Sequence, residues 1–378
     1  DYYLKIAADA AREFIENSPY RIYNTGDPST DYQTVFASGT TNEDETMMGR
    51  NFNLELQVSH FATRSTWGDA CLSINKKFID MFLMADGSRF TDQAGWDKKQ
   101  FYDEMTGRDP RLSQIVRCPG YHRIGSKVTW APSFTNSLTG YNACKYAVSE
   151  AIVPTDGAWS GEDSDLPVFR MAEVLLNYAE AQAERSDYTI TQDDIDMSIK
   201  LLRDRAGMPN LNVAAANANP DDNYLGSAKY GYTNVSGANK GVILEIRRER
   251  AVELAQELDY RWYDLMRWKA GNCMTQALVG MYFPGYGEYD LDGDGVMDIC
   301  LYSGKDAPVH TATSALKVDS SASVVFSDGT SGNLVPYSTR KRKFDEERDY
   351  LFPLPLDDLT LNDKLTQNPG WEVPTGKE

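Results

Sequence analysis

The sequence predicts a mainly α-helical protein whose helical scaffold carries long irregular loops and small β-hairpins. Three observations predict this fold class. Amphipathic stripes with helical spacing recur along the chain, most clearly in its middle. Polar stretches rich in Thr, Asn, Asp and Gly separate these stripes. No part of the chain alternates strands with helices, which is the pattern that a parallel sheet requires.

The first half of the chain is predicted to hold two helices between long loops. Apolar side chains recur at helical spacing from Tyr3 to Ile15, so the chain opens with a helix. A short apolar helix is expected at 71–82. Residues 18–70 and 95–166 are polar and rich in turn residues. Loops of such length inside a folded chain are usually functional.

Two amphipathic helices joined by a short turn are predicted at 168–184 and 192–206. The second helix begins after Thr191, and Asp194 three residues later completes a variant of the capping box. Gly207 ends it. Because both helices carry apolar stripes, we expect them to pack as an antiparallel αα-hairpin, the unit of tetratricopeptide-type stacks.

A long charged helix is predicted at 240–258, followed by a second helical run at 261–270. One interpretation of its charges is acid/base catalysis by Glu253 and Glu257, as in glycoside hydrolases. The other is an ion-pair lattice between helices. Arginines lower the pKa of a neighbouring carboxyl group, whereas a general acid needs a raised pKa, so we expect the lattice. The arginines expected to neutralise the two carboxylates are Arg247, Arg250, Arg261 and Arg267.

The remaining segments are predicted to be less regular. Residues 280–334 are expected to form loops and hairpins, and 340–352 a strand or an extended tail. The basic run RKRK lies at 340–343. In so acidic a chain we expect it to pair with local carboxylates or to face solvent. The alternative is a patch that binds a polyanion.

Composition disfavours several classes of protein. The 38 Lys and Arg against 56 Asp and Glu give a net charge of −18, which disfavours nucleic-acid binding. No run of about 18 apolar residues is present, so no membrane-spanning helix is expected. Three distant histidines and five cysteines without a C-x-x-C pair argue against zinc and thioredoxin-type sites. We expect mostly free thiols, with Cys118 and Cys144 the one pair to test for a disulfide bond.

Four segments stand out as motifs along the chain. They read AADAAREFIENSPYRIY at 7–23, FRMAEVLLNYAEAQAE at 169–184, ILEIRRERAVELAQELDYRWYDLMRWKAG at 243–271 and YLFPLPLDDLTLNDKLTQNPGW at 350–371. Together they resemble the SusD/RagB family, the outer-membrane nutrient-binding lipoproteins of Bacteroidetes. The motifs follow the family's order and span essentially the whole chain.

The resemblance implies a tetratricopeptide-like scaffold whose loops bind oligosaccharide without catalysis. It implies a role in polysaccharide utilisation, as a lid over a SusC-type TonB-dependent transporter. The expected location is the outer face of the cell outer membrane, through a lipid anchor that is not present in this chain. On this basis residues 1–43 are the end of an N-terminal region. Residues 44–371 are then one continuous globular unit with a helical core at 168–271. Part of the family's N-terminal region is expected to be missing from the chain.

Candidate sugar-binding residues are the aromatic side chains of the polar loops, because aromatic faces stack on sugar rings. Trp262, Trp268 and Trp371 lie in the helical and C-terminal motifs, so we expect them to pack. The other tryptophans lie in stretches too polar to form a core, and either stack on a ligand or anchor a loop. The candidates are Trp67, Trp96, Trp130 and Trp159, with Tyr121 as a weaker addition.

The sequence DLDGDGVMD at 290–298 predicts a calcium ion with a structural role. Carboxylates fall at positions 1, 3, 5 and 9 of an EF-hand-like loop, with glycine at position 6. Position 12 is Leu301 rather than Glu, so a bidentate ligand comes from elsewhere or is absent. The alternative is a hydrated turn. The candidate ligands are Asp290, Asp292, Asp294, Asp298 and, through its carbonyl, Val296.

Two other functions compete with glycan delivery. The first is a glycoside hydrolase that uses the paired carboxylates or the acidic loop, for which mixed oligosaccharides would be turned over rather than retained. The second is a family member that carries a peptide or another non-glycan nutrient, for which a glycan array would be blank.

Overall fold

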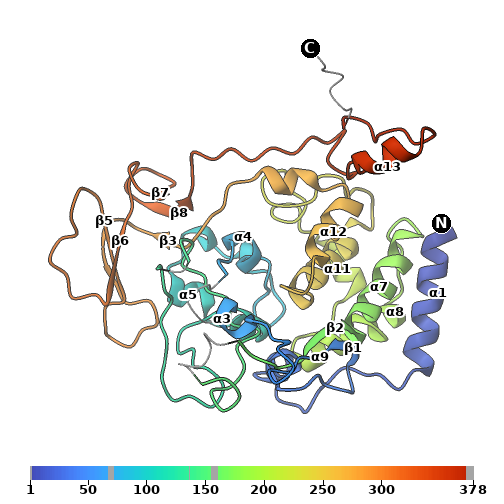
Figure 1. The fold of residues 1–378 in the computed structure, drawn as a ribbon, viewed down its shortest axis with the longest axis horizontal. Coiled ribbons are helices and arrows are strands. Elements are labelled where there is room, and N and C mark those ends of the chain that lie inside the picture. The colour runs from blue at the N-terminus through green and yellow to red at the C-terminus, as the bar shows by residue number, and fades with distance from the viewer. Residues whose placement is uncertain (1, 67–71, 136, 155–160, 372–378) are drawn as a thin grey trace.

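The longer helices and the two three-stranded sheets lie at opposite ends of the molecule (Figure 1). The computed structural model describes residues 2–66, 72–135, 137–154 and 161–371. Helices gather at the end that holds the N-terminus, and small sheets form the other end. In these residues no helix combines the length and the apolar character needed to cross a membrane. The fold class predicted from the sequence is confirmed.

The helical part is built around α7 (Met171–Glu184), which contacts both α1 (Tyr2–Asn17) and α11 (Lys240–Glu253). The apolar stripe of α7 is fully buried, including Leu175 and Leu176. Alanines on the same helix have no bulky side chain, which lets the neighbouring helices approach closely. The periodicity of the sequence therefore identified the core-facing side of this helix.

The partner of α7 in the predicted αα-hairpin is a pair of short helices. They are α8 (Gln192–Asp196) and α9 (Ile199–Arg205), and both contact α7. The capping box of Thr191 and Asp194 is present as predicted. The prediction of a single helix at 192–206 is wrong. The helix is interrupted where the Ser198 hydroxyl donates to the Asp194 carbonyl. That carbonyl is the one that the Ser198 amide would bond in a continuous helix, so the two donors compete for it.

The helix α11 ends at Glu253, before the predicted residue 258. Backbone carbonyls that would continue it are taken by side chains from distant segments. Tyr32 and Arg170 each donate to the Glu253 carbonyl at 2.8 Å, and Lys145 donates to the Ala255 carbonyl at 2.6 Å. The chain then turns through non-glycine residues with φ angles of 61° and 42°, at Gln256 and Leu258. The next helix is α12 (Tyr260–Arg267).

Short elements interrupt the loops predicted in the first half. The predicted helix at 71–82 is a single turn, α4 (Lys76–Ile79), which begins where the Asn75 side chain accepts a hydrogen bond from the Lys77 amide. An antiparallel pair of strands, β1 (Thr46–Arg50) and β2 (Leu166–Arg170), joins two distant segments. Helices of a few residues are too short to show a period in the sequence. They are α2 (Asp31–Ala37), α3 (Ala62–Thr66), η1 (Phe90–Asp92), η2 (Trp96–Lys98), α5 (Phe101–Met105) and α6 (Arg111–Ile115).

The strand-rich end holds two small sheets, in line with the loops and hairpins expected at 280–334. In one, β8 lies between β3 and β7, with both pairs antiparallel. In the other, β5 pairs antiparallel with β4 and parallel with β6. The strands are β3 (Tyr282–Phe283), β4 (Gly287–Tyr289), β5 (Ile299–Tyr302), β6 (Ser314–Lys317), β7 (Val324–Phe326) and β8 (Gly332–Pro336).

After β8 the chain forms an extended arm that crosses the molecule to α13 (Leu356–Leu361) (Figure 1). The arm contains no strand between β8 and α13. Of the two forms predicted for 340–352, a strand or an extended tail, the extended tail is therefore confirmed. Its far end approaches α12, because Trp262 and Trp371 line one hollow. The remaining short helices are α10 (Val213–Ala218) and η3 (Gly271–Thr275).

The four cysteines in the described ranges are free thiols. Cys118 and Cys144 are both buried, and they are not bridged to each other. Burial raises the pKa of the Cys118 thiol to about 12, so this group stays protonated. The disulfide bond considered for this pair is therefore absent, and Cys71 lies outside the described residues.

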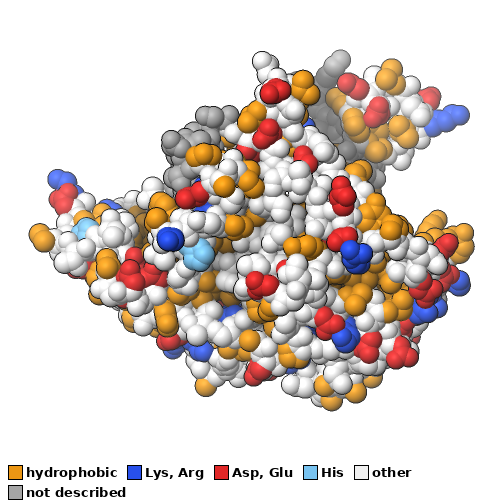
Figure 2. All heavy atoms as spheres, turned by 90° about the horizontal axis from the view of Figure 1, so that it is seen from below, with side chains coloured by type: hydrophobic (Ala, Val, Ile, Leu, Met, Phe, Trp, Pro, Cys, Tyr) orange, Lys and Arg blue, Asp and Glu red, His pale blue; other side chains and the backbone are white. Residues whose placement is uncertain are grey.

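The surface mixes charges of both signs. On the face shown in Figure 2, acidic and basic side chains are interspersed with apolar ones rather than gathered into one broad patch. With a net charge of −18, such a face offers no extended basic surface to a phosphate backbone.

Candidate ligand-binding site

The carboxylate of Glu253 lies at the centre of a buried ion-pair lattice. It contacts Arg111 at 3.0 Å, Arg170 at 2.7 Å and also Arg205. Burial alone would raise the pKa of Glu253, but the charges of Arg205, Arg170 and Arg111 outweigh burial and hold the pKa well below its ordinary value. The carboxylate therefore stays ionised and cannot serve as a general acid.

The carboxylate of Glu257 is held in the same way. It contacts Arg170 and Lys145, each at 2.7 Å. Burial raises its pKa, but Arg170 and Lys145 outweigh that effect and lower it. The two carboxylates share Arg170 as a partner, so they are joined through one guanidinium group rather than facing an open site. This geometry favours the lattice over the acid/base pair.

The four arginines expected to neutralise these carboxylates bind other groups. Arg250 contacts Asp264 at 3.0 Å and Glu180 at 3.1 Å. Arg267 contacts the same two carboxylates, Arg247 contacts Glu184, and Arg261 donates to the Tyr232 hydroxyl. The predicted lattice exists, but its predicted pairing is wrong. The cations around Glu253 come from segments far away in the sequence, such as α6 and β2.

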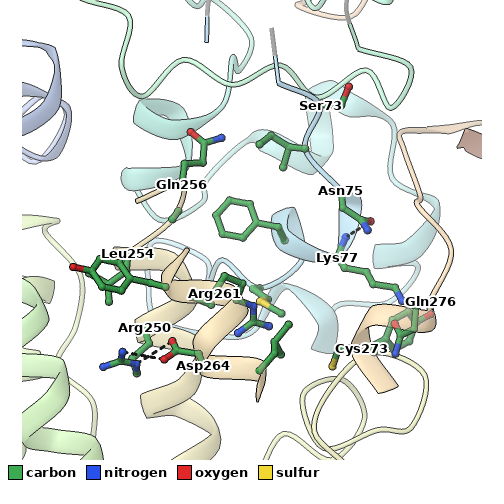
Figure 3. A pocket seen from close by; sticks show the side chains of 18 residues that line it. Ser73, Asn75, Lys77, Arg250, Leu254, Gln256, Arg261, Asp264, Cys273 and Gln276 are labelled. Atoms are coloured by element: carbon green, nitrogen blue, oxygen red, sulfur yellow. Dashed lines mark hydrogen bonds and ion pairs between the residues drawn. The ribbon is translucent and has the colours of Figure 1, made fainter. Parts of the chain in front are cut away.

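A cavity of about 330 Å³ lies beside the lattice, between α4, α11, α12 and η3 (Figure 3). This volume is at the lower end of ordinary small-ligand pockets. Three half-buried aromatic rings line it, those of Phe78, Tyr230 and Tyr260. Tyr230 is fixed by stacking on Tyr224, with ring centroids 4.8 Å apart and an angle of 19° between the planes. The aromatic wall is therefore built in advance of any ligand.

Some polar atoms on the cavity wall have no hydrogen-bond partner among the described residues. Figure 3 shows Lys77, Cys273 and Gln276 gathered on one side and Gln256 on the other. Among the described residues, the amide oxygen and nitrogen of Gln256 and the amide nitrogen of Gln276 are shielded from solvent and have no hydrogen-bond partner. Burial lowers the pKa of Lys77 to about 8. Such buried polar groups require partners, which a polar ligand or water would supply.

The structure places the predicted aromatic residues in two separate regions. Trp96 is half-buried and packs edge-on against Tyr224 and Tyr230, at centroid distances of 5.7 and 5.9 Å. Because Tyr230 lines the cavity, Trp96 supports the cavity wall from behind. Tyr121 and Trp130 instead lie opposite each other in a hairpin, where the Trp130 amide donates to the Tyr121 carbonyl at 2.9 Å. Tyr121 is buried, and Trp130 is half-buried.

The other tryptophans divide between packing positions and residues that the structure leaves undescribed. Trp268 is buried, and its indole nitrogen donates to Glu180. Trp371 donates to the Leu351 carbonyl at 2.8 Å and so anchors the end of the arm. Trp67 and Trp159 lie outside the described residues. The choice of sugar-contacting tryptophans stays a prediction.

The acidic turn brings three predicted metal ligands together. One carboxylate oxygen from each of Asp290, Asp292 and Asp294 lies within 4.8 Å of the others. Asp290 accepts hydrogen bonds from the amides of Gly293 and Gly295 at 2.7 and 2.8 Å. Both glycines have left-handed φ angles, of 81° and 88°, so the turn needs glycine at these positions. Carboxylate oxygens at this spacing fit a hard cation such as Ca²⁺.

The two other predicted ligands stand apart from this cluster. Asp298 accepts a hydrogen bond from the Leu291 amide at 2.8 Å and so ties the turn to β5. Burial, together with the negative charges of Asp292, Asp290 and Asp294, raises the pKa of Asp298 to about 6. The Val296 amide donates to Asp294 at 2.7 Å. A calcium ion in this turn stays a prediction.

The model of the SusD family matches residues 32–371. This chain belongs to the SusD family. Its fold is similar to that of a SusD-like protein from Bacteroides fragilis, with 20% identity and a TM-score of 0.60 over 97% of this chain and 62% of the other. A SusD-like carbohydrate-binding protein from the same species has 21% identity and a TM-score of 0.60, over 95% of this chain and 61% of the other.

The likeness to these solved structures concerns the fold. At such identities, the solved structures show the fold that this SusD-family chain shares with them. The chain spans about three fifths of the length of these structures. No curated protein sequence matches it.

The sequence of this SusD-family chain did not predict which residues line the cavity. They come from four segments of the chain, at 73–81, 230, 250–265 and 273–276, and each is an ordinary residue in its local pattern. Gln256 is the one residue with a recognisable property, a left-handed backbone just past a helix end, and that property appears only in the structure.

Proposed function

We propose that this protein binds oligosaccharide at the cell surface without catalysis and delivers it to a TonB-dependent transporter of the SusC type. The observation that carries this proposal is the match of the SusD family model over residues 32–371. The similar fold of a SusD-like carbohydrate-binding protein from Bacteroides fragilis supports it. The attachment that we propose is a lipid anchor on the outer face of the outer membrane.

The chemistry of the charged helix supports binding rather than hydrolysis. A glycoside hydrolase needs one carboxyl group with a raised pKa beside a second carboxylate. Glu253 and Glu257 both have lowered pKa values and are enclosed by cations. A hydrolase that uses them would therefore lack its proton donor.

We propose the cavity of Figure 3 as one place where a sugar ring docks. Half-buried rings on its wall supply stacking surfaces, and the amides of Gln256 and Gln276 supply donors and an acceptor for hydroxyl groups. Trp96 contributes by holding Tyr230 in place. The loop aromatics Tyr121 and Trp130 are the competing location, and Trp67 and Trp159 stay candidates from the sequence alone.

The test begins with a glycan array and continues with titration of the best ligand against single variants. Tyr230→Ala and Trp130→Ala represent the two locations, and Trp67→Ala and Trp159→Ala test the two further candidates from the sequence. Losing a ring that stacks on a sugar should weaken binding about tenfold or more, by analogy with aromatic stacking on nucleic-acid bases. Trp371→Ala is the matched control, because its ring packs on the arm. Each variant is checked for an unchanged melting temperature.

The outcomes separate the functions. Retention of intact oligosaccharide supports the proposal, and turnover would favour the hydrolase. A blank array with a folded protein would favour a peptide or another non-glycan cargo. If glycan binds but every aromatic variant binds like wild type, the sugar lies on another surface.

We also propose that the acidic turn holds a structural calcium ion. The three clustered carboxylates of Asp290, Asp292 and Asp294 support it. Such an ion would offset their mutual repulsion and fix the turn between β4 and β5.

A further inference from the structure

The basic run at 340–343 is exposed and unpaired. Arg340, Lys341, Arg342 and Lys343 are all exposed, and in the described part of the chain none has a carboxylate within 4.0 Å. Of the two forms expected from the sequence, pairing with local carboxylates is therefore wrong and exposure to solvent is confirmed. Four adjacent like charges repel one another, and this repulsion is relieved when an anion binds.

Three of these exposed cations line a groove. Arg340, Lys341 and Arg342 line a hollow of about 700 Å³ between the arm that leaves β8 (Figure 1) and the segment at 275–278. Thr275 and Leu278 line the same hollow from that segment. A concave site with charge on one wall concentrates its field on a ligand that enters it.

An aromatic ring is held beside the cations. Tyr337 is 42% exposed and lines the same groove. Its backbone has a left-handed φ of 51°, and its amide donates to the Ser323 carbonyl at 2.7 Å. The Arg340 amide donates to the Tyr337 carbonyl at 2.9 Å, and the Arg340 guanidinium carbon lies 4.6 Å from the ring centroid. The turn therefore fixes a ring and a cation next to each other.

The groove adjoins the cavity of Figure 3. Gln276 has extended backbone angles and lines the cavity, whereas its neighbours Thr275 and Ala277 line the groove. Successive side chains of an extended segment point to opposite sides, so one short segment forms a wall of both hollows.

We propose that this groove binds an acidic oligosaccharide, with a carboxylate or sulfate of the sugar on Arg340, Lys341 and Arg342 and a ring face on Tyr337. This inference rests on the proposed function of glycan binding and names its ligand class. A flat anionic membrane would use the charges alone, whereas a groove with a fixed ring and a hydroxyl-bearing wall suits a single sugar chain. The net charge of −18 repels such a ligand from the molecule as a whole, which favours binding at this locally basic groove.

The experiment titrates three probes into the wild-type chain: oligogalacturonate for carboxylates, chondroitin sulfate oligosaccharides for sulfates, and neutral maltooligosaccharides. The test variant is Arg340→Ser with Lys341→Ser and Arg342→Ser. The matched control replaces Lys98, Lys127 and Lys305 by Ser and removes the same charge. These lysines are also exposed, and they form no ion pair with a described residue. Tyr337→Asn tests the ring, since Asn tolerates the left-handed backbone.

One acidic probe should bind the wild type and the control alike, and the triple arginine–lysine variant about tenfold or more weakly. The affinity should fall as salt rises from 50 to 200 mM. Tyr337→Asn should weaken the same probe without changing the salt dependence. Binding of oligogalacturonate would indicate a carboxylate ligand, and binding of chondroitin sulfate oligosaccharides would indicate a sulfate ligand.

Three results would overturn the inference. Neutral glycans binding while both acidic probes fail would leave the proposed function standing and reject the acidic ligand. An equal loss in the control would show a general charge effect. Binding of phosphatidylglycerol vesicles through the basic run, without binding of either acidic probe, would assign the run to a membrane. No glycan binding of any kind would instead reject the proposed function itself.

Discussion

Replacing Arg250 by Ala should be among the most destabilising single changes in the helical core. Arg250 is buried and bonds two buried carboxylates, Asp264 at 3.0 Å and Glu180 at 3.1 Å, as well as the Asn177 side chain at 2.8 Å. Removing one partner of a buried ion pair costs about 3–5 kcal/mol, because it leaves charge without compensation. Arg267 still faces both carboxylates in the variant, so we expect the lower end, about 3 kcal/mol.

Arg267→Ala is a close control, since it removes a cation from the same two carboxylates. The side chain of Arg267 is 45% exposed, against 4% for Arg250. Water already screens its interactions, so its loss should cost about 1 kcal/mol. A second control removes the stranded charge itself. Glu180→Gln in the Arg250→Ala background should recover at least about 1 kcal/mol relative to additive effects.

The assay is urea unfolding followed by circular dichroism and by tryptophan fluorescence, with both probes required to coincide. With a slope of about 3 kcal/mol per molar urea, Arg250→Ala should move the midpoint down by about 1 M. Arg267→Ala should move it by about a third of that amount. Equal shifts for the two variants, or additive effects with Glu180→Gln, would refute the argument that burial sets the strength of this lattice.

Three further predictions concern the acidic turn, the lattice and the capping box. Chelating calcium should lower the melting temperature of the wild type but not that of Asp292→Ala with Asp294→Ala; a melt that ignores chelator leaves the turn without a metal. The lattice glutamates have folded-state pKa values below their ordinary 4.5, so the unfolded chain takes up protons first, and the free energy of unfolding should fall as pH drops below about 4.5. Equal stability at pH 3 and pH 7 would contradict this. Thr191→Ala should cost about 1 kcal/mol in urea unfolding, whereas Thr191→Ser should cost little.

Local pattern was enough for the features whose information lies within a few residues. The apolar stripe of α7, the capping box at Thr191 and the clustering of Asp290, Asp292 and Asp294 each depend on spacings of two to four residues. Such spacings are set by helix and turn geometry, which does not change with the surroundings. The family motifs are also local strings, and the family match agrees with them.

Other features depended on contacts between residues far apart in the chain. The sequence showed that α11 turns charge toward the core, but Arg111 reaches Glu253 across 142 positions, and no local pattern encodes that pairing. The end of α11 is likewise decided by Tyr32, Arg170 and Lys145, which take its carbonyls. An isolated helix would have continued, since its own propensity does not stop it there.

The hollows of the molecule belong entirely to the tertiary structure. The cavity of Figure 3 and the groove beside it exist because segments around Lys77, Gln256, Gln276 and Tyr337 meet, with one short segment forming a wall of each. The sequence alone determined that the run RKRK is basic. The fold decided that it stays unpaired within the described ranges, because the arm carries it to a place where none of their carboxylates comes within 4.0 Å.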